Sequence, residues 1–169
     1  MKTNELPFYD ASDNLTGCCP RFKPQGWDHQ NLHFEDKPFV KATTRSFFHM
    51  PLNMGSVFSK TFKAIEDAGA ADMDHFVVLS KDVSPWKSEH YFAVTKEVPG
   101  EDMSYLSGDF ETRVFEGPYK EAGKWYHQLR DEVRKEGKQP EDIYFFYTTC
   151  PNCAKFYGKN YVVGFAGVS

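Results

Sequence analysis

The chain has 169 residues, of which 40 % are apolar and 17 % aromatic, and its formal charge is −4. This composition predicts a single domain whose hydrophobic core forms without disulfides. Lys and Arg form no run that could neutralise a row of phosphates, and no segment approaches the roughly 20 apolar residues of a membrane span, so neither nucleic acid nor a membrane is an expected partner. Because the N-terminus has no apolar signal core, we expect a cytoplasmic protein.

Residues 1–38 are expected to form an extended arm, since Pro, Asp and Asn recur there without a regular apolar pattern. The arm also carries large apolar side chains that a solvated tail does not need: Phe8, Phe22, Trp27, Leu32 and Phe34. We therefore expect the arm to pack on a domain formed by residues 39–169.

From residue 39 the order strand, helix, strand, strand occurs twice. The first copy comprises a strand at 39–50, a helix at 53–68 and strands at 75–80 and 90–95. The second comprises a strand at 109–116, a helix at 122–136 and strands at 143–148 and 161–168. A shift of 67 residues places Phe58 on Trp125 and Phe62 on Leu129. We predict an α+β fold in which duplicated β-α-β-β units form one antiparallel sheet with two helices on one face.

The predicted strands are apolar on both sides. Ile143–Tyr147 and Phe76–Leu79 lack the alternation of a strand that is half exposed to solvent. The helices cover one face of the sheet. The second face must be covered by the arm, by a partner subunit in a homodimer, or by a bound apolar ligand.

This duplicated pattern, with the segment Phe115-Glu116-Gly117-Pro118-Tyr119 between strand and helix, resembles the gyrase-inhibitor-like (GyrI-like) small-molecule-binding family over residues 39–168. The same domain forms the effector-binding half of multidrug-sensing transcription activators. The resemblance implies a hydrophobic ligand in a cleft between the two halves. Some members hydrolyse strained cyclopropane-bearing molecules with pocket carboxylate and tyrosine groups. The pocket glutamate that serves cationic ligands in the family has no counterpart on the late strand Tyr161–Val168.

All four cysteines fall in two tight pairs, Cys18-Cys19 in the arm and Cys150-Pro151-Asn152-Cys153 in the last hairpin loop. Two such pairs predict a tetrahedral metal site, with zinc as the usual occupant, in which His29 or His33 could replace one cysteine. A thioredoxin-type redox pair fits less well, because too little chain follows Cys153. Four buried thiols without a ligand remain an alternative.

His49 and Glu116 occupy equivalent places in the two copies, each just before a proline and a helix. In a cleft with aromatic walls, either group could act as a general base or orient a polar ligand group. Alternatively, Glu116 simply favours the positive end of its own helix.

Five aromatic residues are candidates for lining the cleft: Trp86, Tyr91, Tyr119, Tyr144 and Tyr147. We expect a protein that binds a hydrophobic or aromatic small molecule between the two repeats. One alternative is a hydrolase that acts on a strained or activated hydrophobic molecule with a Glu or His base. A second alternative is a structural or dimerising domain.

Overall fold

A computed structural model describes residues 2–47 and 50–169. Its first half contains β1 (Asn31–Phe47), the short β2 (Met50–Pro51), α1 (Met54–Asp67), β3 (Val78–Ser84) and β4 (Lys87–Ala93). The second half contains β5 (Met103–Glu116), a 3-10 turn at Tyr119–Glu121, α2 (Ala122–Lys135), β6 (Pro140–Tyr147), α3 (Pro151–Tyr157) and β7 (Tyr161–Val168). The predicted helices at 53–68 and 122–136 are confirmed to within a residue at each end.

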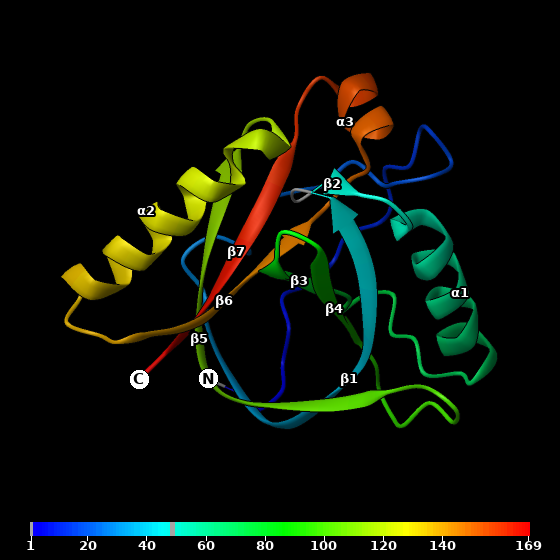
Figure 1. The fold of residues 1–169 in the computed structure, drawn as a ribbon, viewed down its shortest axis with the longest axis horizontal. Helices are drawn as coiled ribbons and strands as arrows, with labels where there is room; N and C mark the ends of the chain where they lie inside the picture. Colours follow the sequence, from blue (N-terminus) through cyan, green and yellow to red (C-terminus); the bar gives the residue numbers. More distant parts are fainter. Residues whose placement is uncertain (1, 48–49) are drawn as a thin grey trace.

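The strands pair antiparallel in the order β1-β4-β3-β6-β7-β5, and β5 pairs in turn with β1. Six strands thus close into a barrel (Figure 1). The α+β class and the antiparallel pairing are as predicted, and the single sheet closes on itself. The first-half strands β1, β4 and β3 are adjacent in the sheet, followed by the second-half strands β6, β7 and β5. A twofold axis between the halves would produce this order. That the two halves superpose stays a prediction.

The barrel closes because β1 is long and bent. The sequence placed a strand at 39–50, whereas β1 begins at Asn31, within the segment expected to form the arm. Its register against β5 shifts between Phe34 and Lys37, and Asp36 there has a positive φ of 45°. Such a bulge bends a strand, so that β1 pairs with β5 before and after the bend and with β4 beyond it.

The two long helices lie on the outside of the barrel (Figure 1). Along α2, Trp125, Leu129 and Val133 are buried at helical spacing and pack against outward residues of β5, β6 and β7. On α1, Ile65 and Phe58 pack in the same way against Val40, Val78 and Phe92. None of the helices in the described residues is long and apolar enough to cross a membrane.

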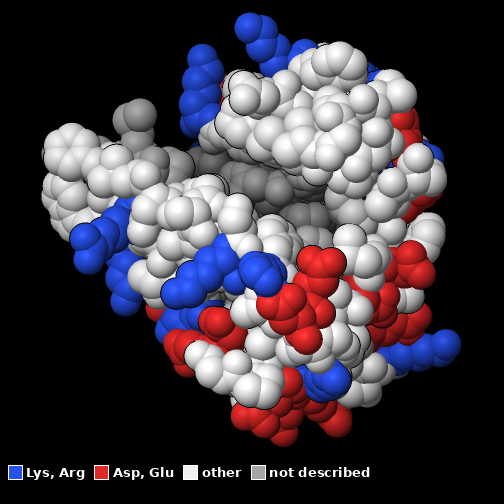
Figure 2. Space-filling view, turned by 90° about the vertical axis from the view of Figure 1, so that its right-hand side faces the viewer, with Lys and Arg blue, Asp and Glu red and all other residues white. Residues whose placement is uncertain are grey.

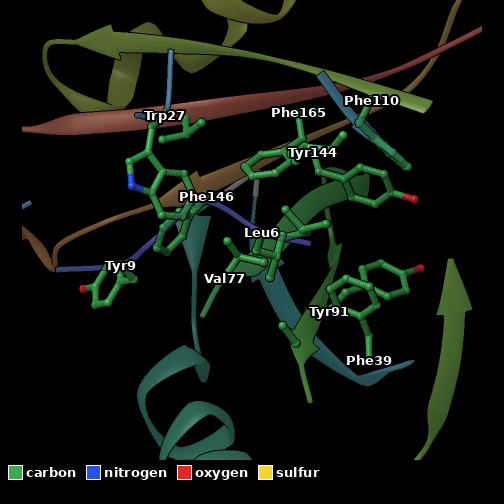
Figure 3. Close-up of a cluster of buried hydrophobic side chains, with 14 of the residues drawn as sticks. Leu6, Tyr9, Trp27, Phe39, Val77, Tyr91, Phe110, Tyr144, Phe146 and Phe165 are labelled. Atoms are coloured by element: carbon green, nitrogen blue, oxygen red, sulfur yellow. The ribbon is translucent and has the colours of Figure 1, made fainter. Parts of the chain in front are cut away.

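The barrel interior is filled by side chains from the strands and from the segment before β1. Leu6, Tyr9, Phe22 and Trp27 of that segment are buried against Phe146 and its neighbours (Figure 3). Phe8, in contrast, is 59 % exposed. The inner face of the strands is therefore covered in part by the chain's own N-terminal residues.

The sequence did not predict α3. We interpreted Cys150–Cys153 as part of a hairpin loop, but Pro151–Tyr157 forms a helix with Pro151 in its first turn and Gly158 in the left-handed conformation at its end. Proline at the start and glycine just beyond the end are the local signals of a short helix. These signals lie beside Cys150 and Cys153, whose spacing also fits a metal-binding loop.

Candidate functional site

The structure brings the four cysteines together. We call Cys18, Cys19, Cys150 and Cys153 the cysteine cluster. Their four sulfur atoms lie within 4.8 Å of one another, although 131 positions separate Cys19 from Cys150. Among the described residues, this group of side chains could hold a metal ion.

Hydrogen bonds fix the geometry of the cysteine cluster. The Thr16 hydroxyl lies 3.4 Å from the Cys153 sulfur and accepts hydrogen bonds from the backbone N–H groups of Cys18 and Cys19. The Cys150 N–H donates to the Cys19 sulfur at 3.4 Å. Contact with Thr16 and the neighbouring thiols lowers the pKa of Cys153 to about 7, whereas burial raises the pKa of Cys19. One thiol of the cluster is thus ready to ionise near neutral pH.

The two histidines that could have replaced a cysteine lie elsewhere. His29 contacts Asp28 at 2.9 Å, and the two ring nitrogens of His33 contact Asp109 at 2.6 Å and Glu35 at 3.1 Å. Hydrogen bonds from the His33 ring to these carboxylates raise the pKa of His33. The cluster is therefore made of sulfur alone.

A second group of polar side chains gathers inside the barrel. We call Lys41, Lys81, Glu89, Tyr91 and Tyr144 the barrel-end cluster. Tyr91 and Tyr144 meet edge to face, with ring centroids 5.6 Å apart. Figure 3 shows their hydroxyl groups pointing the same way, away from the end where Trp27 and Tyr9 lie.

Glu89 is the buried carboxylate of the barrel-end cluster. It accepts hydrogen bonds from the Tyr91 hydroxyl at 3.1 Å and from Lys41 at 2.9 Å. Burial alone would raise the pKa of Glu89, but these two donors hold it below its ordinary value. Burial and the charge of Glu89 raise the pKa of Tyr91. At neutral pH the cluster therefore contains a carboxylate beside a protonated phenol.

Two features connect the barrel-end cluster to the surface. The Lys41 and Lys81 side chains are 30 % and 23 % exposed, and the Lys81 ammonium lies 5.1 Å from the centre of the Tyr144 ring. The cluster also lies next to the contact between β3 and β6. In the described residues these two strands pair at one position, Ser80 with Phe145. Tyr91 comes from the first half and Tyr144 from the second, so the cluster lies where the two halves meet.

Of the five aromatic residues predicted to line a cleft, Tyr91 and Tyr144 are the pair inside the barrel. Tyr119 and Tyr147 form another pair, with rings 5.6 Å apart, and the Tyr119 hydroxyl donates to the carbonyl of Thr149 beside the cysteine cluster. Trp86 is 51 % exposed and contacts Phe47. The structure does not bring the five together around one cavity.

Of the two bases that the sequence suggested, the structure describes Glu116 alone. Glu116 is exposed at the end of β5, opposite Tyr161. His49 lies outside the described residues. Sequence reasoning missed Glu89. The signal that could have revealed it was its position two residues before Tyr91, which places both side chains on the same face of the strand.

Two cavities lie away from the barrel-end cluster. One of about 270 Å³ is lined by Arg21, Phe22, Tyr157 and Tyr161, with Thr148, Thr149 and Lys159, next to the cysteine cluster. The other, of about 450 Å³, lies between the N-terminal residues and β1, near Lys37, Asp72 and His75. Figure 2 shows basic and acidic side chains together on the face that bears α1.

The sequence model of the bacterial hydrolase family matches residues 9–168. The chain belongs to this family. The matched region includes most of the segment before β1 as well as the barrel. No curated protein sequence matches the chain.

Solved structures share the fold at low sequence identity. A hydrolase from Listeria innocua has a TM-score of 0.58 with 10 % identity, covering 84 % of this chain and 92 % of that one. An uncharacterized conserved protein from the same organism gives a TM-score of 0.57 with 10 % identity and the same coverage. The protein SAV2435 bound to tetraphenylphosphonium gives 0.51 with 11 % identity, covering 84 % and 94 %. At such identities these likenesses show the fold alone.

Proposed function

We propose that this bacterial hydrolase family member binds a small, neutral, hydrophobic molecule at the barrel-end cluster, between the two halves of the barrel. The observation that carries the proposal is the buried Glu89 carboxylate, held by Tyr91 and Lys41 beside the edge-to-face tyrosine pair. Aromatic rings around a few convergent polar groups are what small-molecule sites have in common. The resemblance to GyrI-like proteins and the fold shared with a protein bound to tetraphenylphosphonium support the same class of function.

The charges of the barrel-end cluster favour a neutral ligand. Lys41 neutralises Glu89, and Lys81 lies 3.5 Å from Asp142. Two ammonium groups and two carboxylates cancel, so the site offers a lipophilic cation no excess negative charge. A ligand with a hydrogen-bond acceptor, in contrast, finds the Lys41 ammonium and the Tyr144 hydroxyl as donors, while the Tyr91 hydroxyl donates to Glu89.

Titration calorimetry with two probes of similar shape tests the proposal. Triphenylphosphine oxide is neutral and carries an acceptor oxygen, whereas tetraphenylphosphonium is a cation. We expect the neutral probe to bind about tenfold more tightly than the cation, and Tyr144→Leu to weaken its binding by about tenfold, through loss of the aromatic contact. Tyr126→Leu, on the outer face of α2, is the matched control. Binding that is absent, or equal in both variants, would contradict the proposal.

The family description and the placement of Glu89 favour hydrolysis as a second candidate function. The Glu89 carboxylate would take a proton from a water molecule that attacks a strained or activated carbon. Tyr91 would give its proton to the leaving oxygen, and its hydrogen bond to Glu89 would return the proton afterwards. Water adds across the opened bond, so the reaction needs no other reactant.

Styrene oxide, a strained aromatic epoxide, is a suitable probe for this chemistry. We expect slow formation of the diol, reduced about 100-fold or more by Glu89→Gln. Glu66→Gln, on the exposed face of α1, controls for the loss of one negative charge. Glu116→Gln tests the base that the sequence suggested. If that variant loses activity while Glu89→Gln retains it, the assignment to Glu89 is wrong.

The structural alternative makes a different prediction. A domain without a ligand would use the tyrosine pair only for packing, as Trp27 and Phe22 do at the other end of the interior. Neither probe would then bind, and Tyr144→Leu would alter stability alone.

A further inference from the structure

We propose that Cys18, Cys19, Cys150 and Cys153 together bind one zinc ion, which fastens the segment before β1 to α3. This site is separate from the ligand site. Cys150 and Cys153 lie at the start of α3 (Figure 1), whereas the Tyr91 and Tyr144 hydroxyls point away from Trp27 and Tyr9 (Figure 3).

The distances between the sulfur atoms fit tetrahedral zinc. Zinc–sulfur bonds of about 2.3 Å give a tetrahedron with edges of about 3.8 Å. The sulfurs of Cys18 and Cys19 are 3.8 Å apart, and all four sulfurs lie within 4.8 Å of one another. The widest separation therefore needs to close by about 1 Å at most. Adjacent cysteines often diverge, but here both side chains turn to the same side.

The ligand set determines the kind of metal site. Thiolates are soft ligands that select zinc over magnesium or calcium, and a set of four leaves no coordination position for water or substrate. The ion would thus be structural. It would hold together two parts of the chain that no strand pairing connects, since the cysteines come from the irregular segment and from α3.

The surroundings of the cluster already hold the four sulfurs in place. The Thr16 hydroxyl and the Cys150 N–H each contact a sulfur of the cluster. The Tyr157 hydroxyl donates to the carbonyl of Cys19 at 2.6 Å, and the guanidinium of Arg21 lies 4.6 Å from the centre of the Tyr157 ring. Such outer contacts orient metal ligands and reduce the conformational freedom lost on binding.

Two disulfides would explain the geometry less well. Disulfides need only two separate close pairs, whereas all four sulfurs here converge on one point. A redox pair of the thioredoxin type places its cysteines on a long helix that follows a central strand. Here Cys153 lies in the seven-residue α3, and β7 is the last strand.

Zinc at this site would hold the interior packing in place. Cys19 is followed within a few residues by Phe22 and Trp27, whose rings lie 5.4 Å apart and pack on Phe146 and Tyr9. Because the segment is irregular, few backbone hydrogen bonds anchor it. A metal anchor beside Phe22 therefore limits the opening of the segment away from the barrel.

The metal content of protein purified without added metal tests the site. We expect one zinc per chain, tetrahedral thiolate absorption in the cobalt-substituted protein, and fewer than one zinc in four chains for Cys153→Ser and for Cys18→Ser. Asn152→Ala, an exposed position between two of the cysteines, is the matched control and should retain one zinc. Four freely reacting thiols in metal-free wild type, iron in place of zinc, or full zinc in either serine variant would overturn the proposal.

A second measurement uses the wild type, so that it does not depend on the folding of a variant. Removal of zinc with a strong chelator should lower the Tm by about 10 °C, and added zinc should restore it. Hydrogen exchange should increase in residues 15–30 and stay unchanged in α2. If chelation removes zinc and leaves both the Tm and the exchange of residues 15–30 unchanged, the metal does not hold the segment. Binding of triphenylphosphine oxide, measured on the same samples, reports separately on the ligand site.

Discussion

At the scale of single residues, Gly164 on β7 shows how closely α2 approaches the barrel. A Cβ atom at this position would lie 2.7 Å from Leu129 and 3.2 Å from Phe115. We expect Gly164→Ala to lower the free energy of unfolding by about 1–3 kcal/mol, because Leu129 is fully buried and cannot move aside. Urea denaturation measures this change. Gly123→Ala, on α2 with open space around the new methyl group, should leave stability equal or higher.

His90 is a buried imidazole that must stay neutral in the folded state. Its two nitrogens contact the hydroxyls of Thr44 at 2.8 Å and Ser80 at 2.7 Å. Burial lowers the pKa of His90 to about 4, although the charge of Asp82 opposes this shift. As the pH falls below about 6.5, His90 therefore binds a proton in the unfolded chain but stays neutral in the folded protein. The free energy of unfolding decreases over this range.

The consequence is a pH dependence that can be measured. Between pH 7 and pH 5 the wild type should lose about 2 kcal/mol of unfolding free energy through His90. His90→Gln keeps a donor and an acceptor for the two hydroxyls but does not titrate, so it should lose about 2 kcal/mol less over the same range. Parallel urea titrations at the two pH values provide the test. Equal losses in both proteins would show that His90 does not cause the effect.

At the scale of elements, Arg113 fastens β5 to α2. Its side chain is 9 % exposed and contacts Glu132 at 3.0 Å and Glu136 at 2.8 Å, with Glu111 at 3.8 Å. The contacts with Glu132 and Glu136 place the Arg113 side chain between β5 and α2. Removing a buried cation leaves its carboxylate partners uncompensated.

We expect Arg113→Ala to destabilise the protein by about 3 kcal/mol, because it removes one of the two cations that contact the buried Glu111, the other being Lys138. Arg130→Ala, on the same helix with a 32 % exposed side chain and a 3.7 Å contact to Asp131, should change stability by less than about 1 kcal/mol. Thermal unfolding of the two variants distinguishes them. If Arg113→Ala and Arg130→Ala lower the stability by similarly small amounts, the Arg113 contacts contribute little.

At the scale of the whole molecule, substitution of Trp27 tests how much the segment before β1 contributes to the stability of the barrel core. It is 1 % exposed, packs on Phe22 and Phe146, and donates its ring N–H to the carbonyl of Phe8 at 3.2 Å. Trp27→Ala should reduce the unfolding free energy by about 3–5 kcal/mol. Trp86→Ala, at a half-exposed position, should reduce the unfolding free energy by about 1 kcal/mol or less. Denaturant titration gives both values, and a Trp27→Ala loss as small as that of Trp86→Ala would show that the segment contributes little to the core.

The sequence by itself determined the local elements and the pairing of the cysteines along the chain. Buried positions such as Trp125 and Leu129 recur at helical spacing, and spacing within one element is visible without knowledge of its neighbours. The two long helices and the strands on either side of them were predictable for the same reason, whereas the short α3 between β6 and β7 was not. The two cysteine pairs were visible as a motif, but their meeting across the fold was an expectation from chemistry alone.

Only the tertiary structure decided that the sheet closes and which polar groups lie inside it. Closure depends on the bend of β1 between Phe34 and Lys37, which lets one strand pair with both β4 and β5, and no local pattern marks that bend. Once the barrel is closed, Tyr91, Tyr144 and Glu89 face inward, while Trp86 and Glu116 lie on the surface. The direction of a strand's side chains relative to the core is set by long-range pairing, and long-range pairing is the part of folding that a local pattern does not encode.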